Sequence, residues 1–158
     1  MATTPFTALV GCAVPIQQAP MGGIAGPRLI EAVTKAGAMG MLTMTGAPAD
    51  VLSKTLDALA DAGARPVGVS FLVPFLNDAA LHVAIEKAPL VDFYHAVPDE
   101  ALIDRAKRGG ALVEWQVGFP EHVDMAADMG GATSSCCAAW REVAACTVDG
   151  GCGSCSTP

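Results

Sequence analysis

The chain has 158 residues, 52% of them hydrophobic, and its mean hydropathy of +0.43 is enough to fill the core of one domain. Its 9 basic and 16 acidic residues give a formal net charge of -7, and the basic residues form no patch, which argues against nucleic acid as a partner. No apolar stretch approaches the roughly 20 residues of a membrane span, and Met1 to Thr7 do not resemble a secretory signal. We therefore expect a cytoplasmic protein with no membrane partner.

Short apolar runs alternate with longer amphipathic segments along the chain, in the order β, α, β, α. The expected strands are residues 13–19, 39–44, 67–73, 90–94 and 111–117. The expected helices are residues 26–35, 48–62, 77–86, 98–108 and 120–129. Glycines follow most of these helices, as they commonly do at helix C-termini. The order predicts an α/β fold.

The expected strands are apolar on both faces, as in the run from Pro66 to Phe71. Such strands are typical of parallel sheets that helices cover. Two architectures fit, a doubly wound open sheet and part of an eight-stranded barrel, and periodicity does not separate them because both use right-handed strand–helix–strand units. In both, ligands bind at the carboxyl ends of the strands, so the residues after each run are candidates for a site.

Small residues follow the first expected strand. Ala19, Pro20, Met21 and Gly22 would let a planar cofactor approach the backbone, with the methionine against its ring. A glycine turn beside a core methionine explains the same residues. Ser70, in the third strand, offers a hydroxyl that could bind a ligand, although most such hydroxyls satisfy loop backbone.

Polar residues also occur near the ends of the fourth and fifth strands. Glu114 and Gln116 share one face, which would be the lumen of a barrel, and Gln116 is the better ligand candidate because it lies nearer the carboxyl end. His95, close to Asp92, is either an acid or base or an exposed loop residue. No G-x-x-x-x-G-K-[ST] or G-x-G-x-x-G motif follows the first strand, which argues against a nucleotide triphosphatase and a dinucleotide-binding domain.

Four segments in a fixed order carry a family resemblance. They are Val14–Gly23, Glu31–Gly40, Pro66–Phe71 and Gly110–Gly118. They resemble the opening of the nitronate monooxygenases, formerly called 2-nitropropane dioxygenases, over about residues 9–130. The resemblance implies a TIM-type (β/α)8 barrel, of which residues 1–130 would form about five βα units.

The resemblance also implies FMN as cofactor and an oxidoreductase that oxidises alkyl nitronates with O2. Ala19, Pro20, Met21 and Gly22 would lie against the flavin. Ser70 stands where relatives usually carry an FMN-contacting Asn, so that contact would be altered. Gln116 falls near the flavin contacts at the end of the fifth strand.

Residues 131–158 depart from the family. The resemblance implies a sixth strand here, a Gly-Gly-His segment with the catalytic base and loops that clamp the FMN phosphate. The chain instead shows a Cys/Gly/Ser-rich sequence, which predicts an irregular tail and no catalytic residue in this chain. Three interpretations are open: an out-of-frame ending, a disordered extension, and a zinc or redox site. The cysteines of that last interpretation are Cys136, Cys137, Cys152 and Cys155, and because the first two are adjacent we assign no metal ligands.

A barrel truncated in this way would leave the edges of its first and fifth strands exposed. We expect such a chain to aggregate or to form a homo-oligomer, and to be impaired as an FMN oxidoreductase. Two alternatives from other classes are a non-catalytic barrel remnant or assembly subunit, and a small metal-binding module that uses the cysteine tail.

Overall fold

The computed structural model describes residues 3–129, 132–136 and 144–146. Within them, one sheet has the strand order β1-β2-β3-β4-β5-β6. Its strands are β1 (Gly40–Thr43), β2 (Val67–Leu72), β3 (Leu90–Tyr94), β4 (Leu112–Val117), β5 (Ala132–Cys136) and β6 (Ala144–Cys146). Neighbours from β1 to β5 are parallel, and β6 is antiparallel to β5. The predicted α/β fold is confirmed.

The helices are α1 (Pro5–Val10), α2 (Pro27–Lys35), α3 (Ala49–Asp61), α4 (Asp78–Lys87), α5 (Glu100–Arg108) and α6 (Pro120–Asp128), with a 3₁₀ turn η1 (Val73–Phe75) after β2. From α2 onward they coincide with the expected helices within a few residues, because the caps are local. Asn77 accepts from the backbone N–H of Ala80 at 3.1 Å, and Asp99 accepts from those of Ala101 and Leu102. Short-range signals therefore place these helices.

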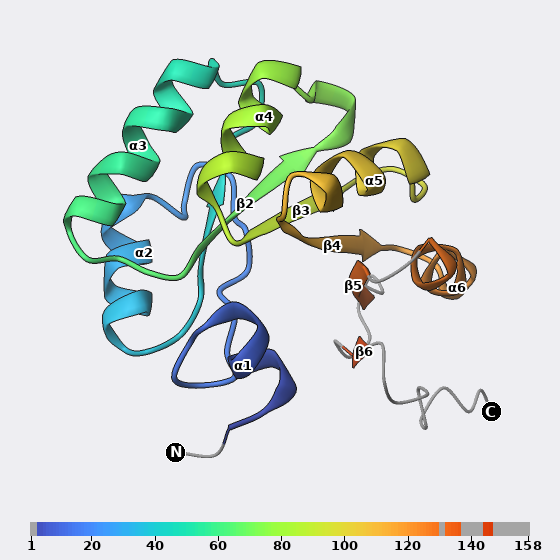
Figure 1. Cartoon of the computed structure of the whole chain (residues 1–158), viewed down its shortest axis with the longest axis horizontal. Helices are drawn as coiled ribbons and strands as arrows, with labels where there is room; N and C mark the ends of the chain where they lie inside the picture. Colours follow the sequence, from blue (N-terminus) through green and yellow to red (C-terminus); the bar gives the residue numbers. More distant parts are fainter. Residues whose placement is uncertain (1–2, 130–131, 137–143, 147–158) are drawn as a thin grey trace.

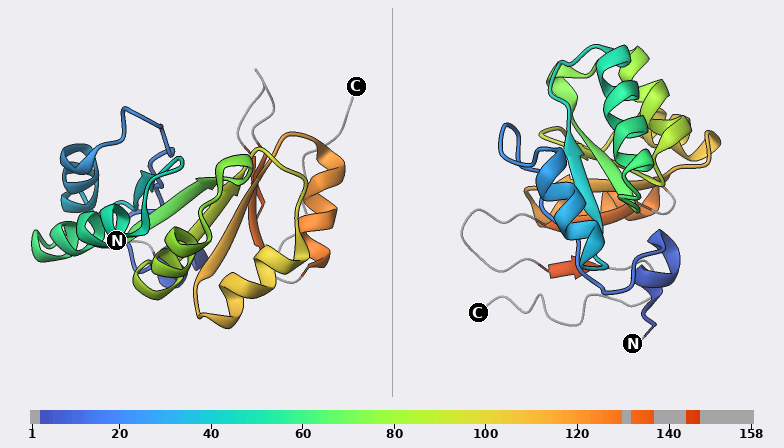
Figure 2. Two further views of the ribbon diagram at one scale, coloured as in Figure 1. Left: turned by 90° about the horizontal axis from the view of Figure 1, so that it is seen from above. Right: turned by 90° about the vertical axis from the view of Figure 1, so that its left-hand side faces the viewer.

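Helices α3, α4 and α5 lie along one face of the sheet (Figures 1 and 2), which we call the outer face. A large cluster of buried residues fills the space between them. In it, the rings of Phe93 and Trp115 lie 5.0 Å apart, and the indole N–H of Trp115 donates to the carbonyl of Ala96 at 3.1 Å. Burying such side chains contributes roughly 2–3 kcal/mol each.

The opposite face of the sheet, the inner face, has its own smaller apolar cluster. Met39, Met41 and Leu90 pack there with Val10 and Cys12, so α1 covers the amino ends of the strands. Gly68 makes this packing possible, because a Cβ at that position would lie 2.7 Å from the Sδ atom of Met41. This apolar cluster therefore fills the amino end of the inner face.

The first expected strand, residues 13–19, is only partly formed. Gln17 makes one isolated parallel bridge with Met39, and the backbone N–H of Gln18 donates to the Met39 carbonyl at 2.9 Å. Pro15 has no N–H to donate, and Ile16 uses its N–H on the Val14 carbonyl at 2.8 Å, so a regular ladder does not develop. The segment lies beside β1 as expected, but the prediction of a full strand is wrong.

Helix α1 is absent from our sequence-based expectations, although its signal is local. Thr4 and Thr7 form a capping box, and Pro5 occupies the first turn, where its missing N–H costs nothing. The helix ends at Gly11, whose φ is 77°. The run Thr-Pro-Phe-Thr could have been identified as a helix start.

The prediction of an irregular tail after residue 130 is wrong for two segments. β5 pairs in parallel with β4 over residues 132–136, and β6 pairs with β5 over residues 144–146. The edge of the expected fifth strand, β4, is therefore covered, because its free N–H and C=O groups can pair with a strand of almost any composition. Residues 137–143 and 147–158, with Cys137, Cys152 and Cys155, lie outside the described residues, and the interpretations of them stay predictions.

Within the described residues, every helix is too short or too polar to span a membrane.

Candidate functional site

A row of polar residues crosses the inner face of the sheet. The register places Thr43 of β1 beside Ser70 of β2, Ser70 beside Asp92 of β3, and Asp92 beside Glu114 of β4. Along each strand, the residues before and after the polar one belong to the apolar cluster of the outer face. Because successive side chains of a strand point to opposite faces, the polar row faces away from the helices. Ser70, Asp92 and Glu114 are 2%, 0% and 5% exposed, which makes this row the main buried polar feature of the described sheet.

Asp92 accepts a hydrogen bond from the side-chain amide of Gln116, with 2.7 Å between Nε2 and Oδ2. Burial, followed by the charge of the neighbouring Glu114, raises the pKa of Asp92 to about 8, while the Ser70 hydroxyl and the Gln116 amide favour the ionised form. The energetic cost of removing the Asp92 carboxylate from water exceeds the stabilisation of its ionised form by Ser70 and Gln116. Burial therefore favours the protonated form of Asp92 near neutral pH.

Glu114 is bound from the other side of the inner face. The side-chain amide of Gln17 donates to Glu114 Oε2. Gln17 lies beside β1, and β2 and β3 lie between β1 and β4, so the sheet must curve to bring Gln17 and Glu114 together. This contact is the observation that favours a barrel-like curve over a flat doubly wound sheet.

Three oxygen atoms are buried without a hydrogen-bond partner among the described residues. Thr43 Oγ1 and Asp92 Oδ1 belong to the polar row, and Gln18 Oε1 belongs to the segment beside β1. The Ser70 hydroxyl is close enough to favour ionised Asp92, but it completes no hydrogen bond with Oδ1. Buried acceptors without partners are costly, typically by 1–3 kcal/mol each. The oxygens of Gln18 and Thr43 are chemically suited to a ligand that brings hydrogen-bond donors, whereas Asp92 Oδ1 can carry the proton of Asp92 itself.

The loop with Ala19, Pro20, Met21 and Gly22 lies at the carboxyl end of β1. A Cβ on Gly22 would be 3.9 Å from the methyl group of Thr43. The Met21 carbonyl accepts from the N–H of Ala25 at 2.8 Å, which closes the turn, and Ala19 and Gly22 are exposed. The loop is therefore accessible and sits next to the polar row.

The structure brings two of the sequence-predicted residues, Ser70 and Gln116, to Asp92. Sequence reasoning did not select Asp92 itself, although a single carboxylate inside the apolar run Leu90–Tyr94 was a usable signal. His95 is exposed after β3, with a φ of 68° and its ring 5.6 Å from that of Tyr94. Among the described residues, no contact joins the His95 side chain to the polar row.

The two other histidines of the described chain lie on helices. His82 is 3.4 Å from Glu86 on α4, and His122 of α6 contacts the Phe119 ring edge-on. Within the described residues, no three His, Cys, Asp or Glu side chains are grouped as metal ligands would be. Within the described residues, the titratable side chains of the polar row are therefore Asp92 and Glu114.

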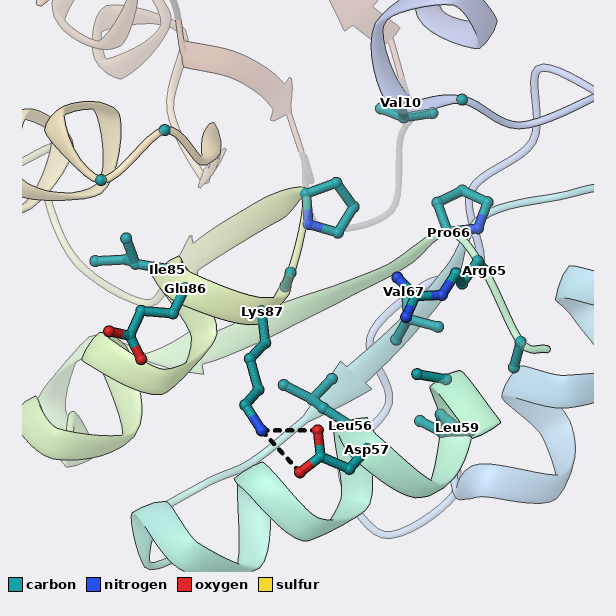
Figure 3. A pocket seen from close by; sticks show the side chains of 17 residues that line it. Val10, Leu56, Asp57, Leu59, Arg65, Pro66, Val67, Ile85, Glu86 and Lys87 are labelled. Carbon is teal, nitrogen blue, oxygen red and sulfur yellow. Dashed lines mark hydrogen bonds and ion pairs between the residues drawn. The ribbon is translucent and has the colours of Figure 1, made fainter. Parts of the chain in front are cut away.

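A cavity of about 690 Å³ lies at the other end of the sheet, where the strands begin (Figure 3). Its lining includes Arg65, Pro66 and Pro89, and Lys87 on its wall binds both carboxylate oxygens of Asp57 at 2.7 Å. In barrels the amino ends of the strands serve stability, and chemistry takes place at the carboxyl ends. We therefore place the candidate site at the polar row and not in this cavity.

Comparison with known proteins shows the family and the fold of the chain. The sequence profile of the family described as nitronate monooxygenase matches residues 3–139. The dehydrogenase of (3aS,4S,5R,7aS)-5-hydroxy-7a-methyl-1-oxo-octahydro-1H-indene-4-carboxyl-CoA from Mycobacterium tuberculosis is 30% identical over 132 residues, which are 80% of this chain and 36% of that protein. The protein of the same name from Rhodococcus jostii matches with the same identity and the same coverage.

Two solved structures share the fold. FabK from Thermotoga maritima superimposes with a TM-score of 0.74 and 27% identity, over 82% of this chain and 42% of that one. A nitroalkane oxidase from Streptomyces ansochromogenes gives a TM-score of 0.69 and 27% identity, over 80% of this chain and 46% of that one. The chain thus spans between about a third and a half of the length of these relatives.

Proposed function

Because this chain belongs to the nitronate monooxygenase family, we propose that it forms the first part of an FMN-dependent oxidoreductase barrel. The observation that carries the proposal is the polar row at the inner face, with buried acceptors that need donors from a ligand. The barrel part includes β5, since that strand continues the parallel sheet.

The residues present fit a flavin. A flavin carries a planar ring with an N–H edge and a side chain of hydroxyl donors, and the buried oxygens of Gln18 and Thr43 are acceptors for such groups. The loop that contains Met21 and Gly22 is accessible and has little side-chain bulk, so a ring can approach its backbone. We propose Ala19, Pro20, Met21, Gly22, Ser70 and Gln116 as the flavin-contacting residues.

Bound FMN would supply the capacity to accept electrons from a substrate. The chain's own residues would bind and orient the ring, and the buried Asp92 and Glu114 would hold a proton close to it. As substrate we propose a small nitronate, with O2 as oxidant, because the family and one structural relative are named for nitro compounds. The curated relatives are named as dehydrogenases of a coenzyme A ester, which makes such an ester the competing substrate class.

The test is reconstitution with FMN, followed by desalting and a visible absorption spectrum. We expect retained flavin with a spectrum that differs from that of free FMN, and then O2 consumption on addition of an alkyl nitronate. Reduction of retained flavin by an acyl-CoA ester, without turnover of the nitronate, would replace the substrate class. A folded chain that retains no flavin would contradict the proposal and favour a non-catalytic remnant or assembly subunit.

A further inference from the structure

Asp92 and Gln116 meet across two neighbouring strands at the inner face. Asp92 is fully buried on β3, and Gln116 is half-buried on β4, one pleat nearer the carboxyl end than Glu114. The Gln116 amide nitrogen donates to Asp92 Oδ2 at 2.7 Å, a short bond for an N–H donor. The contact is therefore a strong local constraint on the Gln116 side chain.

An amide side chain has a donor end and an acceptor end, and a hydrogen bond at one end determines where the other end lies. Gln116 Nε2 donates to Asp92 Oδ2. This bond also determines the position of the side-chain carbonyl oxygen, which is the other terminal atom of the same amide group. Asp92 Oδ1 has no hydrogen-bond partner among the described residues and is the oxygen on which a proton can reside. Oδ2 then remains an acceptor whether Asp92 is protonated or ionised.

We infer that Asp92 is a positioning residue, which orients the Gln116 amide so that its carbonyl oxygen accepts a hydrogen bond from a flavin at the inner face. The inference rests on the proposed flavin site and adds to it a residue that does not itself touch the flavin. It explains why a carboxyl group is kept in a fully buried place between apolar neighbours, where its burial opposes ionisation.

The test is a double-mutant cycle on FMN affinity, measured by quenching of flavin fluorescence. Asp92→Leu removes the acceptor, and we expect the Kd for FMN to rise roughly tenfold, as for loss of one oriented hydrogen bond. Asp92→Asn keeps an acceptor oxygen, and we expect a Kd within about twofold of the original chain. If Asp92→Leu does not give folded protein, Asp92→Ala removes the same acceptor without added bulk.

The Gln116→Leu background separates positioning from general damage. In that background the Asp92→Leu change should add no more than about a twofold loss, because its effect passes through Gln116. The same tenfold loss with and without Gln116 would overturn the inference. Asp61→Asn, which changes an exposed carboxylate on α3, is the matched control for loss of charge.

A second measurement does not depend on flavin. In an NMR spectrum of the ligand-free protein, the side-chain NH2 of Gln116 should exchange slowly with water, and it should exchange quickly in Asp92→Leu but not in Asp92→Asn. Fast exchange in the unchanged protein would overturn the inference. A protein that shows the protected amide but binds no FMN would contradict the proposed function and leave the orienting contact between Asp92 and Gln116 established.

Discussion

Asp92 and Glu114 lie side by side on neighbouring parallel strands, both buried, and each accepts a hydrogen bond from a different glutamine, Gln116 for Asp92 and Gln17 for Glu114. Two adjacent buried carboxyl groups cannot both ionise without a large electrostatic cost. The two amides offset part of that cost, and protonation of one of the two carboxyl groups, which burial favours at Asp92, removes the repulsion.

This pair makes stability depend on pH. The pKa of Asp92 is about 8 in the folded chain and about 3.9 in an unfolded one, so the folded state binds more protons between these values. The free energy of unfolding should therefore be highest near pH 4 and fall as the pH rises towards 8, by an amount on the order of a few kcal/mol. Urea unfolding across this range measures the slope.

Asp92→Asn removes the titrating group, and we expect it to flatten that slope and to be more stable than the unchanged chain above about pH 8. The exposed Asp61→Asn variant should keep the original slope. Identical slopes in the Asp92→Asn variant and the unchanged chain would show that another group is responsible.

The aromatic stack on the outer face should carry much of the stability. Phe93 is fully buried between Phe71 and Trp115. Phe93→Ala should lower the free energy of unfolding by about 3–5 kcal/mol, because it leaves a cavity in a packed core. The control is Phe75→Ala, since Phe75 is 61% exposed, and it should change stability by less than about 1 kcal/mol. Equal losses would contradict the assignment of the core.

Gly68 should tolerate a side chain poorly. A Cβ there would lie 2.7 Å from Met41 Sδ and 2.8 Å from Met39 Cε. Because both are ends of flexible side chains, we expect Gly68→Ala to cost about 1–3 kcal/mol in thermal or urea unfolding and not to abolish folding. A Cβ added at Gly118 would have no heavy atom within 4 Å, so Gly118→Ala serves as the control.

A bulky residue at Gly22 should block the proposed flavin site and spare the fold. Its backbone is exposed, and an added Cβ would meet only the Thr43 methyl at 3.9 Å. We expect Gly22→Val to raise the Kd for FMN at least about tenfold, with little change in melting temperature. Gly26→Ala, at the start of α2, is the control and should bind FMN normally. Unchanged affinity in Gly22→Val would remove this loop from the site.

The sequence by itself determined the order of helices and strands from α2 to α6, because caps, glycine stops and apolar periodicity act over a few residues. It also determined which face of β4 carries Glu114 and Gln116, since side chains alternate along a strand. The family resemblance rested on the same local segments. The prediction of a regular first strand was wrong because Pro15 and the local bond between Ile16 and Val14 displace the ladder.

Only the tertiary structure determined which side chains contact one another at the inner face. Gln17 reaches Glu114 across 97 positions of sequence, and Gln116 reaches Asp92 across 24, through a curve and a register that no local pattern encodes. Pairing with β4 likewise made a strand of residues 132–136, whose composition predicted none. Asp92 is the centre of the candidate site because burial and a neighbouring carboxyl group raise its pKa, and both depend on distances set by the folded sheet.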